Sequence, residues 1–446
     1  MAETSTAKKL GIWSATALVM GNMIGGGIFL LPSALAGFGS ISLLGWVISA
    51  VGSIFLALIF SRLSRMLPQK NGGPYAYTQV AFGDFMGFLI AWGYWVSIWT
   101  ANAAITVTFV GSLSVFFPVL AENRLLAVAT GLIAIWLLTW VNSKGIRNAA
   151  IVQVITTVLK IAPLLLIIIG ALFFFEWSNF RPFHKGEYSI WTTLGLTASM
   201  TLYAFLGFES ATIPAKSIDR PRTTIPLATT LGTLLTALIY IASTAAVMGL
   251  VPMAELENSA APIADAAMRI GGEDMRYWVA GGIAIATFGA LNGWILILGQ
   301  IPLAIAEDHL FPKVFAKLNR YGAPHLGLII GSILVSILML FNYSEGLVEQ
   351  FKFMTLLTTL SVLTPYLFST AAHLLFVLSG KTDDNTMIVA VILSILAFVY
   401  SMWMVYGAGA EVVYWGFLLL LAGIPFYVWI KWRNARSNQF ETKADK

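Results

Sequence analysis

The chain has 446 residues, of which 58% are hydrophobic and only 11% are charged, and its mean hydropathy is +0.82. A soluble globular domain is about 45–50% apolar and about 25% charged. A water-soluble chain of this size could not hide so much apolar surface, which excludes soluble enzymes, disordered proteins and nucleic-acid-binding proteins. The net charge of +5 comes from Lys and Arg residues at the ends of apolar runs, not from a continuous basic surface.

The reactive residue types are sparse. The chain has no cysteine, which excludes disulfides and thiolate chemistry. Its four histidines are scattered without metal-ligand spacing, and the apolar runs contain neither HExxH nor paired aspartates. We therefore expect no metal, no cofactor and no catalytic residues, and a protein that is not an enzyme.

Apolar runs long enough to cross a membrane fill most of the chain. A spanning helix needs about 20 mostly apolar residues. The fold class predicted is therefore an all-α membrane protein with twelve transmembrane helices. The runs lie near 13–35, 41–66, 84–112, 124–142, 149–175, 190–215, 225–251, 277–304, 325–342, 352–379, 386–407 and 411–432.

The distribution of positive charge predicts the orientation. With both termini in the cytoplasm, nineteen of the 26 Lys and Arg residues lie in cytoplasmic loops and six in outer loops, while Lys160 lies within a span. Cytoplasmic loops of membrane proteins carry an excess of Lys and Arg. We expect a multi-pass plasma (inner) membrane protein with cytoplasmic termini and the acidic loop 252–276 outside.

Two of the runs contain features that weaken a helix. The first holds Gly25, Gly26 and Gly27 in mid-membrane, where each glycine costs roughly 1 kcal/mol relative to Ala in a helix. The sixth holds Gly207 and the carboxylate of Glu209. These runs are five apart, so each begins a five-helix half, and an odd number of spans inverts the second half relative to the first.

Glycine-interrupted helices at matching places in two halves indicate a transporter site. Unwound backbone is tolerated in a membrane only where it lines a cavity. The N–H groups of Gly25 to Gly27 suit a carboxylate, and the carbonyls ending the inner half of the sixth span, around Tyr203 to Phe205, suit an ammonium group. Together they match the two ends of an α-amino acid. The alternative is that these glycines serve close helix packing.

Several motifs resemble the amino acid–polyamine–organocation superfamily, and within it the basic amino acid/polyamine antiporters. The similarity runs from about residue 10 to 435. It is carried by GNMIGGGIFLLP, NGGPYAY, LYAFLGFESA, RPRTTIPLA, LNGWILILGQ and AEDHLFPKVFAKLN. The resemblance implies exchange of amino acids or amines by alternating access, with broken helices 1 and 6 and inverted repeats of the bacterial leucine transporter type. It also leaves a homodimer open, because relatives are often dimers.

The same resemblance implies the organisation of the chain and the roles of single residues. The expected segments are a cytoplasmic tail 1–12, a first inverted repeat 13–175, a second 190–379, two further helices 386–432 and a cytoplasmic tail 433–446. The implied substrate-binding residues are Asn22, Ile24, Gly25, Gly26, Gly27, Trp99, Asn102, Tyr203, Ala204, Phe205, Trp294 and Thr358. The implied gating or coupling residues are Tyr94, Lys160, Tyr203 and Glu209. Many relatives have Ser or Thr where this chain has Gly26.

Lys160 and Glu209 are the ionisable residues expected at membrane depth, where such side chains are expensive and usually functional. Glu209 is interpreted either as a structural tie across the breaks or as a proton carrier. Lys160 resembles a lysine that replaces a bound cation in some relatives, and its ammonium is expected to bridge the first span to the fifth or eighth. The remaining alternative for Lys160 is a side chain that extends to the membrane surface.

The substrate stays open between two classes. Trp294 and Asn102 favour cationic amino acids and their amines, because a Trp face attracts a guanidinium or ammonium group. Lys160, Tyr203 and Gly26 favour neutral L-amino acids, with exchange or proton coupling. Trp99 lies one helical turn from Asn102, and for Trp99 a place in the core is the favoured interpretation.

Overall fold

The computed structural model describes residues 11–67, 73–144, 149–208, 220–380 and 386–433, and within these ranges the regular structure is helical. The helices are α1 (Ile12–Met23), α2 (Gly27–Ala36), α3 (Leu43–Met66), α4 (Pro74–Phe82), α5 (Asp84–Ser114), α6 (Val119–Glu122), α7 (Arg124–Ser143), α8 (Ala149–Phe174), α9 (Ile190–Phe205), α10 (Pro221–Leu250), α11 (Met253–Leu256), α12 (Pro262–Glu307), α13 (His325–Phe341), α14 (Leu347–Leu378), α15 (Met387–Gly407) and α16 (Ala410–Leu421). Short 3-10 helices lie at Ser40–Ser42, Trp177–Phe180 and Lys313–Ala316.

Each predicted apolar run corresponds to a helix or to a pair of helices. Eight helices of the described part are long and apolar enough to cross a membrane, and four further apolar helices are shorter. The run 13–35 is divided, because α1 ends at Met23 and α2 begins at Gly27. Helix α12 starts earlier than expected and changes direction at Gly271 and Gly272, where the backbone is not helical.

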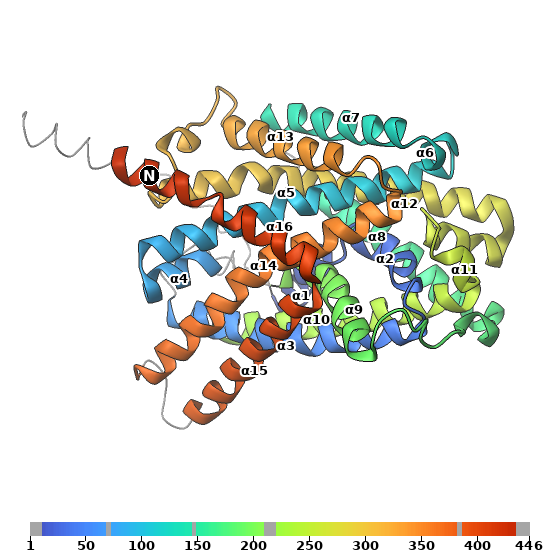
Figure 1. The fold of residues 1–446 in the computed structure, drawn as a ribbon, viewed down its shortest axis with the longest axis horizontal. Coiled ribbons are helices and arrows are strands. Elements are labelled where there is room, and N and C mark those ends of the chain that lie inside the picture. The colour runs from blue at the N-terminus through green and yellow to red at the C-terminus, as the bar shows by residue number, and fades with distance from the viewer. Residues whose placement is uncertain (1–10, 68–72, 145–148, 209–219, 381–385, 434–446) are drawn as a thin grey trace, which may run out of the picture.

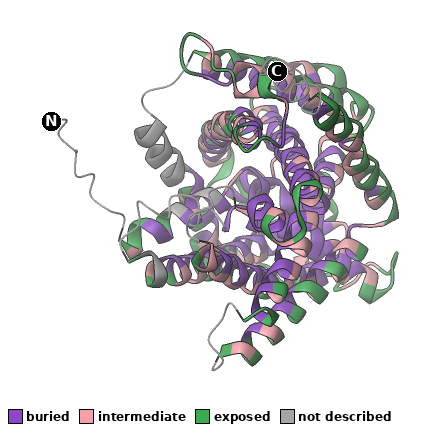
Figure 2. Cartoon of the chain, turned by 90° about the vertical axis from the view of Figure 1, so that its left-hand side faces the viewer, coloured by how far each residue is buried: buried purple, intermediate pink, exposed green. Residues whose placement is uncertain are grey.

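The outer helices present apolar side chains outward. Ile388, Val399 and Tyr406 on α15 are 75%, 59% and 66% exposed. Figure 2 shows exposed residues around the rim of the helix bundle and buried residues at its centre. Apolar surface of this extent is costly in water, so these helices face lipid. The protein is a multi-pass membrane protein.

Two groups of helices pack side by side, and α2 contacts both of them; Figure 1 shows the arrangement. In one group α3 packs against α9 and α10, and α10 also packs against α1. In the other, α12 packs against α5, α7, α8 and α13. Helix α2 contacts α5 and α12 of one group and α9 and α10 of the other. A rearrangement at α2 would therefore reach both groups.

Short helices that the hydropathy analysis did not predict cover the two ends of the bundle. Figure 1 shows α4 at one end and α6 and α11 at the opposite end. The hydroxyl of Tyr75 on α4 donates to Oδ2 of Asp308 at 2.9 Å, just beyond the last residue of α12. Burial, and then the neighbouring Asp308 carboxylate, raise the pKa of the Tyr75 hydroxyl. The hydroxyl therefore keeps its proton and joins α4 to α12.

Helix α15 lies directly against α9 through two glycines. A Cβ built on Gly407 would lie 2.4 Å from the carbonyl oxygen of Gly195, and one on Gly195 would lie 3.0 Å from Cα of Gly407. The hydroxyl of Ser199 donates to the carbonyl of Met404 at 2.8 Å in the same contact. Small residues permit such close approach of membrane helices.

The variant Gly407→Ala is expected to lower the melting temperature of the full-length protein in detergent. The added methyl must push the two backbones apart, and overpacking of this kind costs about 1–3 kcal/mol. The matched control is Gly282→Ala on α12, where a Cβ meets nothing within 4 Å. Equal melting temperatures for the two variants would contradict the close contact.

Candidate functional site

The first helix stops inside the bundle. Ile24 follows α1 with ψ of 82°, outside the helical range, and its N–H donates to the Met20 carbonyl at 2.8 Å. The N–H of Gly25 donates back to the Met23 carbonyl at 2.7 Å. Helix α2 then begins at Gly27, and the first N–H groups of a helix have no partner within it. The break therefore offers backbone donors at the start of α2.

Helix α9 ends at Phe205, inside the bundle, and Leu206 follows with ψ of 135°. The sequence placed Tyr203 to Phe205 in the inner half of the sixth span, which does not agree with the orientation predicted from the positive charges. In the orientation predicted above, the sixth span enters from the outer side, so α9, its first half, is the outer half. The carbonyls around Tyr203 to Phe205 still end a half-helix, as expected.

Two contacts fix the glycines of the first break. A Cβ on Gly27 would lie 2.6 Å from Cε1 of Tyr203, so the start of α2 fits directly against that ring. A Cβ on Gly26 would lie 3.2 Å from Cγ2 of Ile105 on α5. A Ser or Thr at position 26, as in many relatives, would require Ile105 to move. Gly27 thus brings α2 into contact with α9, and Gly26 brings the start of α2 against α5.

Tyr240 on α10 joins the ends of both half-helices, and the sequence analysis missed it. Its buried hydroxyl lies 2.8 Å from the carbonyl of Met23, the last residue of α1, and 3.2 Å from the carbonyl of Ala204 near the end of α9. The hydroxyl has one proton and donates to one carbonyl at a time. A tyrosine in the middle of the run 225–251 was the available signal.

Asn102 on α5 and Trp294 on α12 are brought together. Nδ2 of Asn102 donates to the carbonyl of Ile98 at 2.9 Å and to that of Trp294 at 3.3 Å. Oδ1 of Asn102 is buried and has no donor among the described residues. The Trp294 side chain is only partly buried, and a Cβ on the preceding Gly293 would meet nothing within 4 Å. An acceptor oxygen is therefore placed on the helix turn that contacts Trp294.

The other predicted side chains divide between the site and the surrounding core. Oγ1 of Thr358 on α14 donates to Oγ1 of Thr100 at 2.9 Å and so ties α14 to α5. Tyr203 packs edge-on against Phe351, with ring centroids 6.2 Å apart. Tyr94 is half-buried against the core. Trp99 is 5% exposed and lines a groove between α5, α13, α14 and α16.

Lys160 reaches from α8 to the first helix. Its Nζ lies 3.4 Å from the carbonyl oxygen of Gly21 in α1, and the residue is 4% exposed. The ammonium is therefore directed into the bundle, not toward the membrane surface. The interaction joins the fifth span to the first span near the break, which is the placement that a bridging role requires.

Two predicted residues have no described side chain. Glu209 lies outside the described residues. Asn22 lies within α1, but the structure describes only its backbone. Ile24, Ala204 and Phe205 are buried around the two helix ends.

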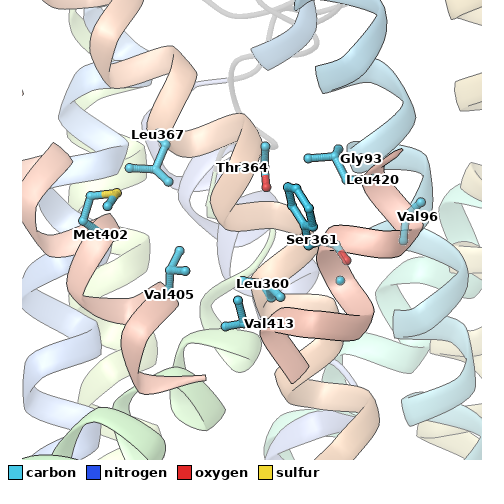
Figure 3. A pocket seen from close by; sticks show the side chains of 12 residues that line it. Gly93, Val96, Leu360, Ser361, Thr364, Leu367, Met402, Val405, Val413 and Leu420 are labelled. Atoms are coloured by element: carbon cyan, nitrogen blue, oxygen red, sulfur yellow. The ribbon is translucent and has the colours of Figure 1, made fainter. Parts of the chain in front are cut away.

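The structure has two cavities away from the helix breaks. The smaller, of about 170 Å³, lies between α5, α14, α15 and α16. Figure 3 shows Ser361 and Thr364 of α14 on one side of it and Met402 of α15 on the other, and Oγ of Ser361 donates to the Leu357 carbonyl of its own helix at 2.8 Å. The larger is the groove that Trp99 lines, of about 1050 Å³. Neither cavity is lined by a residue of the two breaks.

Comparisons with known proteins agree over the full length. The family described as amino acid permease matches residues 10–429. The chain is 31% identical to an arginine/ornithine antiporter of Pseudomonas aeruginosa, over 94% of this chain and 90% of that protein. It is 33% identical to an arginine/agmatine antiporter of Chlamydia pneumoniae, over 95% of this chain and 90% of that protein. It is 33% identical to a cadaverine/lysine antiporter of Escherichia coli, over 95% of each chain.

Replacing Tyr240 with Phe is expected to slow transport by about tenfold or more and to lower the melting temperature. The change leaves the carbonyls of Met23 and Ala204 without their shared donor, and an unmade buried hydrogen bond costs about 1–3 kcal/mol. The control is Tyr406→Phe, at a tyrosine of α15 that is 66% exposed. Transport at the wild-type rate by Tyr240→Phe would show that the two breaks do not depend on this hydroxyl.

Proposed function

This chain belongs to the amino acid permease family and, within it, to the amino acid/polyamine antiporters, so it is a transporter and not an enzyme. We propose that it exchanges cationic amino acids for their amines. The antiporters that it matches carry arginine, ornithine, agmatine, lysine or cadaverine in their names. Transport proceeds by alternating access around the two helix breaks, without covalent chemistry.

The observation that carries this proposal is the unpartnered acceptor of Asn102 beside Trp294. Oδ1 of Asn102 is buried and has no described donor. An ammonium or guanidinium group would donate to this oxygen. The half-buried Trp294 ring would hold the same cation by its face, which is worth roughly 2 kcal/mol when desolvated. At the other end of the substrate, the backbone donors at the start of α2 would receive the carboxylate.

Neutral L-amino acids are the second candidate, and Lys160 is the observation that favours them. Its ammonium lies inside the bundle, 3.4 Å from the Gly21 carbonyl. A fixed positive charge near the site disfavours a substrate with two positive charges. In that case the aromatic face of Trp294 would hold an apolar side chain, and Lys160 would be the residue that couples transport to protons.

The proposed topology follows the twelve apolar runs. Helices α1 and α2 form the first span, and the first inverted repeat covers 13–175 and the second 190–379. Two further helices cover 386–432, and both termini, 1–12 and 433–446, lie in the cytoplasm of a plasma (inner) membrane. The excess of Lys and Arg on one side supports this orientation.

The function is tested by uptake of radiolabelled arginine into proteoliposomes that contain unlabelled arginine, agmatine, alanine or nothing. We expect uptake only with arginine or agmatine inside, because an exchanger moves one substrate only against another. Uptake into empty vesicles would contradict obligatory exchange. Absence of arginine uptake, with uptake of labelled neutral amino acids under an imposed proton gradient, would establish the second candidate.

The variant Trp294→Leu separates the two substrate classes. It is expected to reduce uptake of a cationic substrate by about thirtyfold, the loss that corresponds to roughly 2 kcal/mol of cation–π attraction, and to change uptake of a small neutral substrate far less. Trp278→Leu on the same helix is the control, because Trp278 is 82% exposed. An equal loss of both substrates in Trp294→Leu would exclude the cation–π contact.

A further inference from the structure

A groove runs along α5, between α13 and the last apolar span, Ala410–Arg433, which begins with α16. Its floor is a stripe of aromatic side chains at helical spacing on α5, formed by Phe88, Trp92, Trp95 and Trp99. One wall is a stripe of aliphatic residues on α13 that includes Ile330, Leu334 and Ile337, and the other is the face of the last apolar span from Glu411 to Ile430. The groove is therefore apolar along its length and polar only near one end.

The dimensions of the groove fit a lipid chain. Its volume is about 1050 Å³. Pockets for drug-sized ligands have volumes of about 300–1,000 Å³, so the groove is large enough for a long acyl chain. The lining residues of the last apolar span, Ala410–Arg433, run from Glu411 to Ile430. At about 1.5 Å per residue they cover nearly the whole hydrocarbon thickness of about 30 Å. The rims are open to the bilayer, since Phe426 and Trp429 are 48% and 41% exposed.

The polar end of the groove has a defined charge pattern. Glu345, Glu349 and Glu411 line it, and Glu349 is paired with Lys352 at 2.6 Å. Glu345 and Glu411 have no ion pair among the described residues. The Arg124 guanidinium donates to the carbonyl of Ser344, which also lines this end. Free carboxylates and a guanidinium thus meet where the apolar floor stops.

We propose that this groove is a binding site for an aminophospholipid, with one acyl chain along the α5 aromatic stripe and the headgroup at Glu345 and Glu411. A primary ammonium group has three N–H donors for carboxylates, whereas a quaternary choline has none. The lipid phosphate is placed toward Arg124. A zwitterionic headgroup fits this arrangement better than an anionic headgroup, because the three glutamates would repel a net negative charge. The proposal requires only a protein in a membrane and is independent of the transported substrate.

A lipid bound in this groove would affect the transport site through α5. The floor residue Trp99 lies next to Thr100, which bonds Thr358 of α14 at 2.9 Å, and one turn before Asn102. The indole Nε1 of Trp99 is buried without a partner among the described residues. A chain seated against this turn contacts the helix that carries the acceptor Oδ1.

The test uses the five tryptophans of the groove, Trp92, Trp95, Trp99, Trp415 and Trp429, as reporters. The full-length protein is reconstituted in phosphatidylcholine vesicles with increasing fractions of phosphatidylethanolamine or phosphatidylcholine that carry brominated acyl chains. Bromine quenches tryptophan fluorescence on contact. We expect brominated phosphatidylethanolamine to reach half-maximal quenching at a several-fold lower fraction than brominated phosphatidylcholine.

The double variant Glu345→Gln/Glu411→Gln should make the two lipids equal. The control double variant Glu122→Gln/Glu187→Gln removes exposed glutamates outside the groove and should preserve the preference. Equal quenching of the wild-type protein by both lipids would overturn the proposal. Tryptophans protected from both lipids in a cross-linked dimer would overturn it in favour of a second copy of the chain in the groove.

Discussion

The structure depends on one constraint, which is that backbone polar groups exposed by a helix break must find partners where no water is available. Helix α1 stops at Met23 inside the bundle, and α9 stops at Phe205. Three carbonyls at these ends receive side-chain donors from other helices. The Tyr240 hydroxyl of α10 lies within hydrogen-bond distance of the carbonyls of Met23 and Ala204, and Nζ of Lys160 on α8 donates to the carbonyl of Gly21. The ends of α1 and α9 are therefore stabilised by side chains of α10 and α8.

The same constraint explains why the donors at the start of α2 remain available. The supporting side chains reach the carbonyl ends of α1 and α9, while the N–H groups that open α2 lie at the opposite side of the break. Gly27 has no side chain there because the Tyr203 ring occupies the space, with Cε1 2.6 Å from the position of a Cβ. The break thus keeps a positively polarised helix end next to an aromatic ring.

A second polar group is left without a described partner on α5, the helix that packs against Gly26. Asn102 uses its amide N–H groups on the carbonyls of Ile98 and Trp294, and its Oδ1 receives no described donor. A buried acceptor without a partner costs about 1–3 kcal/mol. Such a cost is retained where a ligand supplies the donor, which is the basis of the proposed cation contact. Trp99, one turn earlier on α5, lines the groove. Helix α5 therefore carries both the proposed substrate contact, Asn102, and part of the groove wall.

The sequence by itself determined the spans, the break in the first of them and the family. Hydropathy and glycine content are local quantities, so runs such as 124–142 and 386–407 agree closely with α7 and α15, and Gly25 to Gly27 marked the end of α1. The short helices α4, α6 and α11 were missed, because they are too short for a hydropathy window, and α4 is held by the contact of Tyr75 with Asp308. Only the tertiary structure decided which residues support the breaks. Tyr240 and Met23 are 217 positions apart and Lys160 and Gly21 are 139 apart. No local pattern records such pairs, because the face that each helix turns to its neighbours is fixed by packing of the whole bundle.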